Sequence, residues 1–160
     1  MVVVGYRPGS EPVLKGISLR VGPGEKVVLC GPSGSGKSSL IMAALQMMQL
    51  TDGHVFVDDL DTSAVAGGEL RSHMNVVPQE PFFMPGTLRF NIDPKGRSGD
   101  DEIARALSRV DLWAKVSLNG GLDQELDTSE WSHGEKQLLC LARALLVPSK
   151  ILFLDEAMSR

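Results

Sequence analysis

The alternation of apolar and polar stretches along the chain predicts strands that are followed by helices. Two continuous apolar runs, KVVLC at 26–30 and ILFL at 151–154, are typical of strands buried on both faces. Shorter strands are expected at 2–6, 17–21, 54–57 and 75–77. Helices are expected from Lys37 to about Met48, at 69–74, along 100–113 and at 132–146. This order indicates an α/β fold around a mostly parallel sheet.

The two long helices near the C-terminus carry recognisable end signals. The stretch DDEIARALSRVDLW has acids in its first turn and apolar residues at 103, 107 and 110, as an amphipathic helix requires. The second helix follows a loop at about 117–131 and is stopped by Pro148. Its start, S-H-G-E, fits a capping box with Ser132 as N-cap and Glu135 three residues on.

Composition limits the function classes that need consideration. The 160 residues are 42% hydrophobic, which suits one domain with a buried core. A net charge of −4 with scattered basic residues argues against nucleic acid as a partner. Neither a signal peptide nor an apolar run of transmembrane length is found. The cysteines and histidines lack metal-ligand spacing; Cys30 and Cys140 are expected to be buried, and His54, His73 and His133 to be surface or partly buried residues.

The stretch GPSGSGKS at 31–38 fits the phosphate-binding pattern G-x-x-x-x-G-K-[ST] between a predicted strand and a predicted helix. The glycines allow backbone N–H groups to surround phosphate oxygens, and the helix N-terminus adds partial positive charge. Lys37 is expected to reach the β and γ phosphates, and the Ser38 hydroxyl to bind Mg²⁺. The alternative is an ordinary turn. The predicted nucleotide-binding residues of this loop are Gly31, Ser33, Gly34, Ser35, Gly36, Lys37, Ser38 and Ser39.

Two acids follow the last apolar run. Asp155 stands at the predicted carboxyl end of that strand, where ligands bind in open α/β sheets, and is expected to hold Mg²⁺. Glu156, one residue later, is expected to polarise an attacking water. The alternative is a strand that ends in two solvated carboxylates.

Four stretches in this order resemble the nucleotide-binding domains of ABC transporters: 15–40, 76–94 (VVPQEPFFMPGTLRFNIDP), 131–146 (WSHGEKQLLCLARALL) and 151–157. The N-I-D-P sequence and Glu156 are most similar to the second such domain of subfamily C, the multidrug-resistance-type exporters. The resemblance implies a P-loop NTPase (RecA-like) core, a small N-terminal antiparallel β part and an inserted helical subdomain at roughly 80–147, all in one domain over 1–160.

The same resemblance implies roles for residues that are uninformative alone. Tyr6 would stack on adenine, although a lone tyrosine also suits edge-strand packing. Gln79 would contact Mg²⁺ and the lytic water, although glutamine is equally an ordinary loop residue. The signature residues facing a partner's ATP would be Ser132, His133, Gly134 and Glu135. The family prefers L-S-G-G-Q where this chain has W-S-H-G-E, and the charge of Glu135 is expected to weaken this half-site.

The function implied is Mg²⁺-dependent ATP hydrolysis that drives transport by an exporter at the cytoplasmic face of a membrane. The implied partners are a second nucleotide-binding domain, arranged head to tail, and transmembrane domains. The sequence ends soon after Glu156. It is therefore interpreted as a partial domain that lacks the C-terminal part of the sheet and hydrolyses ATP negligibly alone. A non-hydrolysing truncated product and a soluble ABC ATPase are the alternatives.

Overall fold

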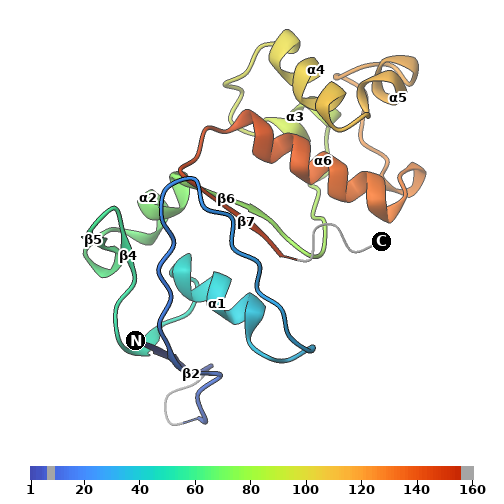
Figure 1. The fold of residues 1–160 in the computed structure, drawn as a ribbon. Coiled ribbons are helices and arrows are strands. Elements are labelled where there is room, and N and C mark those ends of the chain that lie inside the picture. Colours follow the sequence, from blue (N-terminus) through green and yellow to red (C-terminus); the bar gives the residue numbers. More distant parts are fainter. Residues whose placement is uncertain (7–9, 156–160) are drawn as a thin grey trace. The chain divides into compact units, whose positions relative to one another are not determined.

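A computed structural model describes residues 1–6 and 10–155 (Figure 1). The chain divides into two compact units, Met1–His73 and Met74–Arg160. The first unit holds the phosphate loop, and the second holds the signature helix and the last strand. The mixed α/β class predicted from the sequence is confirmed.

The first unit is built on a small antiparallel sheet with the order β2-β1-β3. Its strands are β1 (Val2–Val4), β2 (Leu14–Ile17) and β3 (Leu50–Asp52). Helix α1 (Lys37–Ala44) contributes Ala43 to a core that it shares with Val2, Val4 and Leu14. The unit continues through a hairpin of β4 (Phe56–Val57) and β5 (Leu60–Asp61), the short helix η1 (Thr62–Ala64) and α2 (Gly67–Ser72).

The second unit contains a parallel strand pair covered by a helix. β6 (Met74–Val77) pairs with β7 (Ile151–Leu154), and Met74 lies opposite Ile151. Helix α6 (His133–Leu146) packs against β6, where Val77 and Cys140 share a buried cluster. The Asn75 side-chain amide donates to the carbonyl groups of Ala144 and Val147, at 2.9 and 2.7 Å. These bonds satisfy carbonyl oxygens that the end of α6 would otherwise leave unpaired.

Three further helices pack with α6 into the main core of the second unit (Figure 1). They are α3 (Leu88–Ile92), α4 (Asp100–Arg109) and α5 (Trp113–Leu118), and the short helix η2 (Thr128–Glu130) precedes α6. The core residues Ile92, Ile103, Leu107 and Leu139 are at most 1% exposed. Over the described ranges, no helix is both long and apolar enough to cross a bilayer.

The strand predicted at 26–30 does not form. These residues have no regular structure, Val28 is 82% exposed, and Cys30 is exposed rather than buried. A strand requires a neighbour for its N–H and C=O groups, and none of the described strands pairs with this segment. The parallel sheet of the described residues is therefore the β6–β7 pair, which is narrower than predicted.

Other elements differ from prediction in their boundaries or exposure. The strand predicted at 17–21 lies at Leu14–Ile17, and α1 ends at Ala44 rather than near Met48, shortly before Gln46 turns left-handed at φ 54°. The helix predicted along 100–113 ends at Arg109, because Asp111 has a left-handed backbone at φ 58°; the separate helix α5 begins at Trp113. β7 was predicted to be buried on both faces, but Leu152 and Leu154 are 45% and 50% exposed, whereas Ile151 and Phe153 are half-buried. Alternate residues of a strand point to opposite faces, so only one face of β7 is shielded.

Candidate functional site

The phosphate loop has a backbone that glycine makes possible. Gly34 and Gly36 have φ values of 79° and 92°, in the left-handed region that other residues rarely adopt. A Cβ on Gly36 would also come within 3.1 Å of Leu14 Cδ2. Gly36 is the N-cap of α1 and offers no side chain to the first-turn N–H groups. The start of α1 therefore has no side-chain cap and presents the positive end of the helix dipole, as an anion-binding helix does.

Lys37 is held over the same loop. Its ammonium group donates to the carbonyl oxygens of Gly31 and Pro32, at 2.9 and 3.0 Å. Residues 31–35 are exposed, whereas Lys37 and Ser38 are half-buried. Lys37, near the end of the predicted loop, therefore contacts the two residues with which the loop begins.

Tyr6 lies next to α1 in the same unit. Its hydroxyl is 2.9 Å from Oγ of Ser39, which is 4% exposed. The sequence placed both residues in the nucleotide site but did not foresee their hydrogen bond. The Tyr6 side chain remains 67% exposed, which leaves its ring accessible to a ligand.

Gln79 and Asp155 follow the carboxyl ends of the two paired parallel strands. The backbone N–H of Asp155 donates to the Val77 carbonyl at 3.0 Å, which continues the β6–β7 ladder one residue past β7. Gln79, two residues after β6, is exposed. These two predicted metal ligands therefore both follow the carboxyl ends of the parallel pair. Glu156 lies outside the described residues.

The segment after Gln79 is anchored by two residues, Asn91 and Arg143, for which the sequence predicts no separate role. Asn91 is fully buried; its Oδ1 accepts from the Met84 N–H and its Nδ2 donates to the Met84 carbonyl, both at 2.9 Å. Arg143 of α6 donates from Nε to the Asn91 carbonyl at 2.7 Å and lies over the Phe83 ring. Burial lowers the pKa of Arg143. The sequence contains one signal for this anchor. Arg143 is the single arginine inside the apolar run of α6, and a cation in such a run needs hydrogen-bond partners.

The signature helix begins with the predicted capping box, which is confirmed. Ser132 Oγ accepts from the Glu135 N–H at 3.2 Å, and Glu135 Oε2 accepts from the Ser132 N–H at 2.8 Å. Ser132 and His133 are exposed, and Gly134 is half-buried. The pKa of Glu135 is lowered, first by its hydrogen bond with Lys115 and then by the Ser132 N–H. Glu135 is therefore an ionised carboxylate with two partners rather than an unpaired charge.

Replacing Ser132 with alanine is expected to lower the free energy of unfolding of the second unit by about 1 kcal/mol, the usual contribution of an N-cap. Urea titration followed by tryptophan fluorescence measures this, because Trp113 and Trp131 both lie in the second unit. Ser108→Ala is the matched control, since the Ser108 hydroxyl only bonds back to Ala104 in an exposed helical turn. Equal effects of the two substitutions would contradict the capping role.

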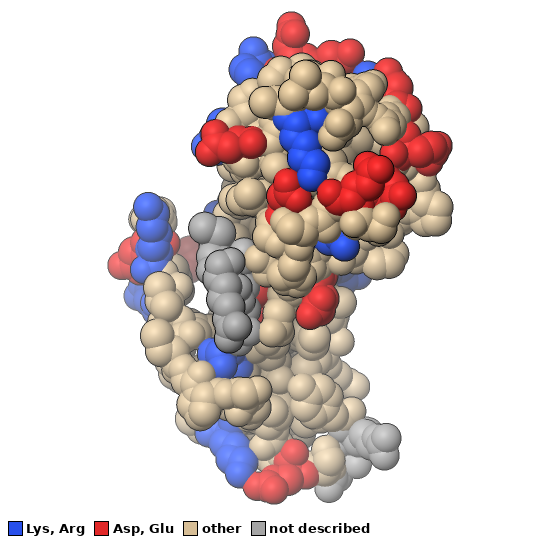
Figure 2. All heavy atoms as spheres, turned by 90° about the vertical axis from the view of Figure 1, so that its right-hand side faces the viewer, with Lys and Arg blue, Asp and Glu red and all other residues tan. Residues whose placement is uncertain are grey.

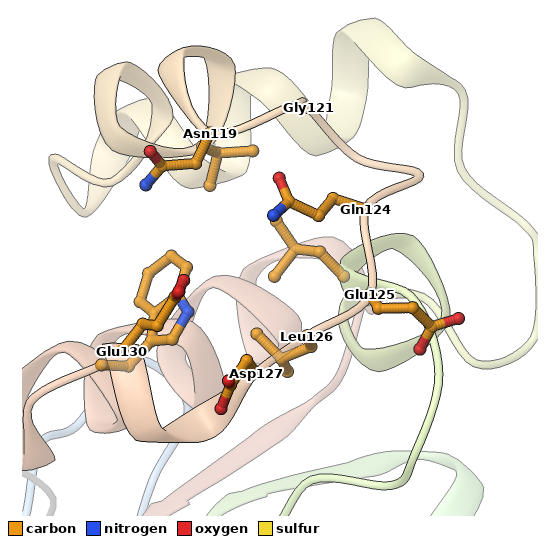
Figure 3. A pocket seen from close by; sticks show the side chains of 10 residues that line it. Asn119, Gly121, Gln124, Glu125, Leu126, Asp127 and Glu130 are labelled. Atoms are coloured by element: carbon orange, nitrogen blue, oxygen red, sulfur yellow. The ribbon is translucent and has the colours of Figure 1, made fainter.

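Two hollows among the described residues lie away from the predicted residues of the phosphate loop. A cavity of about 20 Å³ next to Trp131 is lined by loop residues such as Gln124 and Glu125 (Figure 3). That volume suits about one water molecule. A larger hollow of about 500 Å³ in the first unit is lined by the end of α1, His54 and the 60s segment. Neither hollow is lined by residues 31–39.

Comparison with known proteins identifies the family. The sequence profile of the ABC transporter family matches residues 14–159. The chain belongs to the ABC transporter family. The family's ATP-binding domain is the part to which the chain corresponds, and domains of this family bind ATP, typically with Mg²⁺. Membership also makes ATP hydrolysis the activity to expect of the site.

Relatives within the family include subfamily C members. The chain is 46% identical to "ATP-binding cassette sub-family C member 10" of Mus musculus over 98% of its length, 45% identical to "ABC transporter ecdL" of Aspergillus rugulosus over 99%, and 45% identical to "ABC multidrug transporter B" of Aspergillus fumigatus over 96%. It spans 10%, 11% and 10% of these relatives, respectively. The similarity thus concerns one ATP-binding segment of much longer transporters.

Proposed function

We propose that this chain is the ATP-binding and ATP-hydrolysing part of an ABC-type exporter, within a RecA-like core whose helical subdomain covers roughly 80–147. The observation that carries the proposal is the phosphate loop: left-handed glycines lead into α1, which has no side-chain cap and begins at Lys37. Backbone N–H groups, a helix dipole and one flexible cation match the chemistry of a triphosphate. Tyr6 is proposed to stack on the adenine ring.

Magnesium fits the oxygen donors among the proposed site residues. Mg²⁺ prefers hydroxyl, carboxylate and amide oxygens together with water and substrate phosphates. Ser38 offers a hydroxyl, Gln79 an amide oxygen and Asp155 a carboxylate, and we propose these three residues as its ligands. The bound ion would neutralise charge on the phosphates. Glu156 is proposed to accept a proton from the attacking water, as a general base does.

The signature residues are proposed to act on a nucleotide held by a second nucleotide-binding domain. Ser132 has an exposed hydroxyl at the first turn of a fourteen-residue helix, and Gly134 leaves the backbone there accessible. His133 and Glu135 complete this segment. The proposed assembly is a head-to-tail pair of such domains attached to transmembrane domains at the cytoplasmic face of a membrane. Similarity to transporters named as multidrug and sub-family C proteins supports export rather than another use of ATP.

Replacing Lys37 with alanine is expected to weaken binding of Mg²⁺–ATP to the purified chain by about 10- to 150-fold. That range corresponds to about 1.5–3 kcal/mol for hydrogen bonds to a charged group. Titration with a fluorescent ATP analogue measures the change. The loss arises because the ammonium group no longer compensates phosphate charge.

Lys26→Ala is the matched control for this experiment. Lys26 is an exposed lysine of the same unit and lies outside the loop, so its loss removes the same charge without touching the proposed site. Binding that falls equally in both variants would indicate general electrostatics. Binding that Lys37→Ala leaves unchanged would overturn the proposed function.

A further inference from the structure

Lys115 of α5 joins three parts of the segment 130–135, which we name the signature segment. Its ammonium nitrogen donates to Glu135 Oε1 at 2.9 Å and to the Glu130 carbonyl at 3.0 Å. The same nitrogen lies 4.3 Å from the centre of the Trp131 ring, within cation–π range. The Lys115 and Glu135 side chains are each 30% exposed, so solvent screens their interaction only in part.

Lys115 contacts the side chains of Trp131 and Glu135, and both residues differ from the family pattern. Trp131 and Glu135 stand where L-S-G-G-Q has leucine and glutamine. A leucine has no π face and a glutamine has no charge, so neither would attract an ammonium group as strongly. The two departures and Lys115 therefore form one interacting set.

Several acidic residues lie close to Glu135 along the chain. The loop before α6 carries exposed carboxylates, and Figure 2 shows acidic side chains gathered over the helices of this unit. Glu130 and Asp127 belong to that loop, and His133 and Lys136 flank Glu135 on α6. Among the residues that the structure describes, Lys115 is the one cation within ion-pair distance of the Glu135 carboxylate.

We propose that Lys115 is a positioning residue for the signature segment: it cancels the charge of Glu135 and fixes Trp131, so that the Ser132 hydroxyl and the start of α6 can face an anionic phosphate. This inference rests on the proposed function in one respect, because the phosphate is the terminal group of a nucleotide bound to a second domain. Without Lys115, an unpaired carboxylate would stand at the point where that phosphate approaches, and like charges repel.

The first test needs no nucleotide. In a Trp113→Phe background Trp131 is the only tryptophan, so its fluorescence reports on the signature segment alone. Lys115→Met is expected to shift the Trp131 emission and to raise its quenching by acrylamide, because the ammonium no longer covers the ring. Lys115→Arg is expected to preserve both signals, and Lys95→Met, at an exposed lysine, is the matched control.

The second test measures ATP hydrolysis by the full-length protein as a function of ATP concentration. Lys115→Met is expected to lower kcat/KM for ATP about fivefold, the factor that one unit charge is worth at about 4 Å in water. The double variant Lys115→Met/Glu135→Gln is expected to return to within about twofold of Glu135→Gln alone, since both charges are then absent. A purely structural role of Lys115 predicts no such recovery.

The outcomes separate the inference from the proposed function. Unchanged Trp131 fluorescence in Lys115→Met, or a double variant as impaired as Lys115→Met alone, would overturn the positioning role and leave nucleotide binding intact. Nucleotide binding that Lys37→Ala leaves unchanged would overturn the proposed function, whatever Trp131 reports. Altered fluorescence together with recovery in the double variant supports the inference.

Discussion

Replacement of Leu107 by alanine is expected to lower the free energy of unfolding of the second unit by about 2–5 kcal/mol. Leu107 is completely buried in the core formed by α3, α4, α5 and α6. The loss combines the lost transfer of buried methyl groups with the cavity left in a close-packed interior. Urea unfolding followed by the fluorescence of Trp113 and Trp131 measures this effect, because both tryptophans belong to this unit.

Leu118→Ala is the matched control, since Leu118 ends α5 and is 85% exposed. Its removal creates no cavity, and the expected change is within about 0.5 kcal/mol. Similar midpoints for the two variants would contradict the assignment of Leu107 to the core. Because α5 and α6 carry Lys115 and the signature segment, loss of this core is also expected to disturb the Trp131 environment.

Replacement of Asn91 by alanine is expected to lower the free energy of unfolding of the second unit by about 2–4 kcal/mol. Each buried polar group left without a partner costs about 1–3 kcal/mol, and two groups are affected. The Asn91 side chain satisfies both the N–H and the carbonyl of Met84. Alanine leaves both groups without that partner and leaves a small cavity. Urea unfolding of the unmodified protein and of Asn91→Ala at neutral pH measures the loss.

Asn119→Ala serves as the control for Asn91, because Asn119 is an exposed asparagine at the end of α5. A second measurement gives the substitution a local readout. Amide hydrogen exchange at Met84 is expected to accelerate in Asn91→Ala beyond the change in global stability, because its N–H loses its acceptor. Unchanged exchange at Met84 would show that Asn91 does not hold this segment.

The phosphate loop and the signature cap could be predicted from the sequence because each is a local device. Left-handed glycines, a lysine at the start of a helix and a serine three residues before a glutamate act over a few residues. The structure has positive φ at Gly34 and Gly36, which glycine permits, and it contains the predicted capping box at Ser132. The roles assigned to these residues in ATP binding and hydrolysis remain predictions.

The prediction of a strand at 26–30 was wrong, because an apolar run does not specify a pairing partner. An apolar run specifies a strand only through a neighbouring strand that accepts its hydrogen bonds, and that neighbour is a non-local choice. The exposure of Cys30 and Val28 follows from the missing pairing. Asp111 has a comparable effect on helices, because its left-handed backbone divides the pattern of one amphipathic helix into two.

The sequence by itself determined the mixed α/β class, the glycine-dependent loop, the helix cap and the family, because these depend on short spacings and residue types. Only the tertiary structure decided that Asn91 and Arg143 anchor the segment after Gln79, and that Lys115 neutralises Glu135. The partners in these contacts are as far apart as 52 residues along the chain. Packing brings them together, and burial turns an otherwise ordinary polar side chain into one that must be paired.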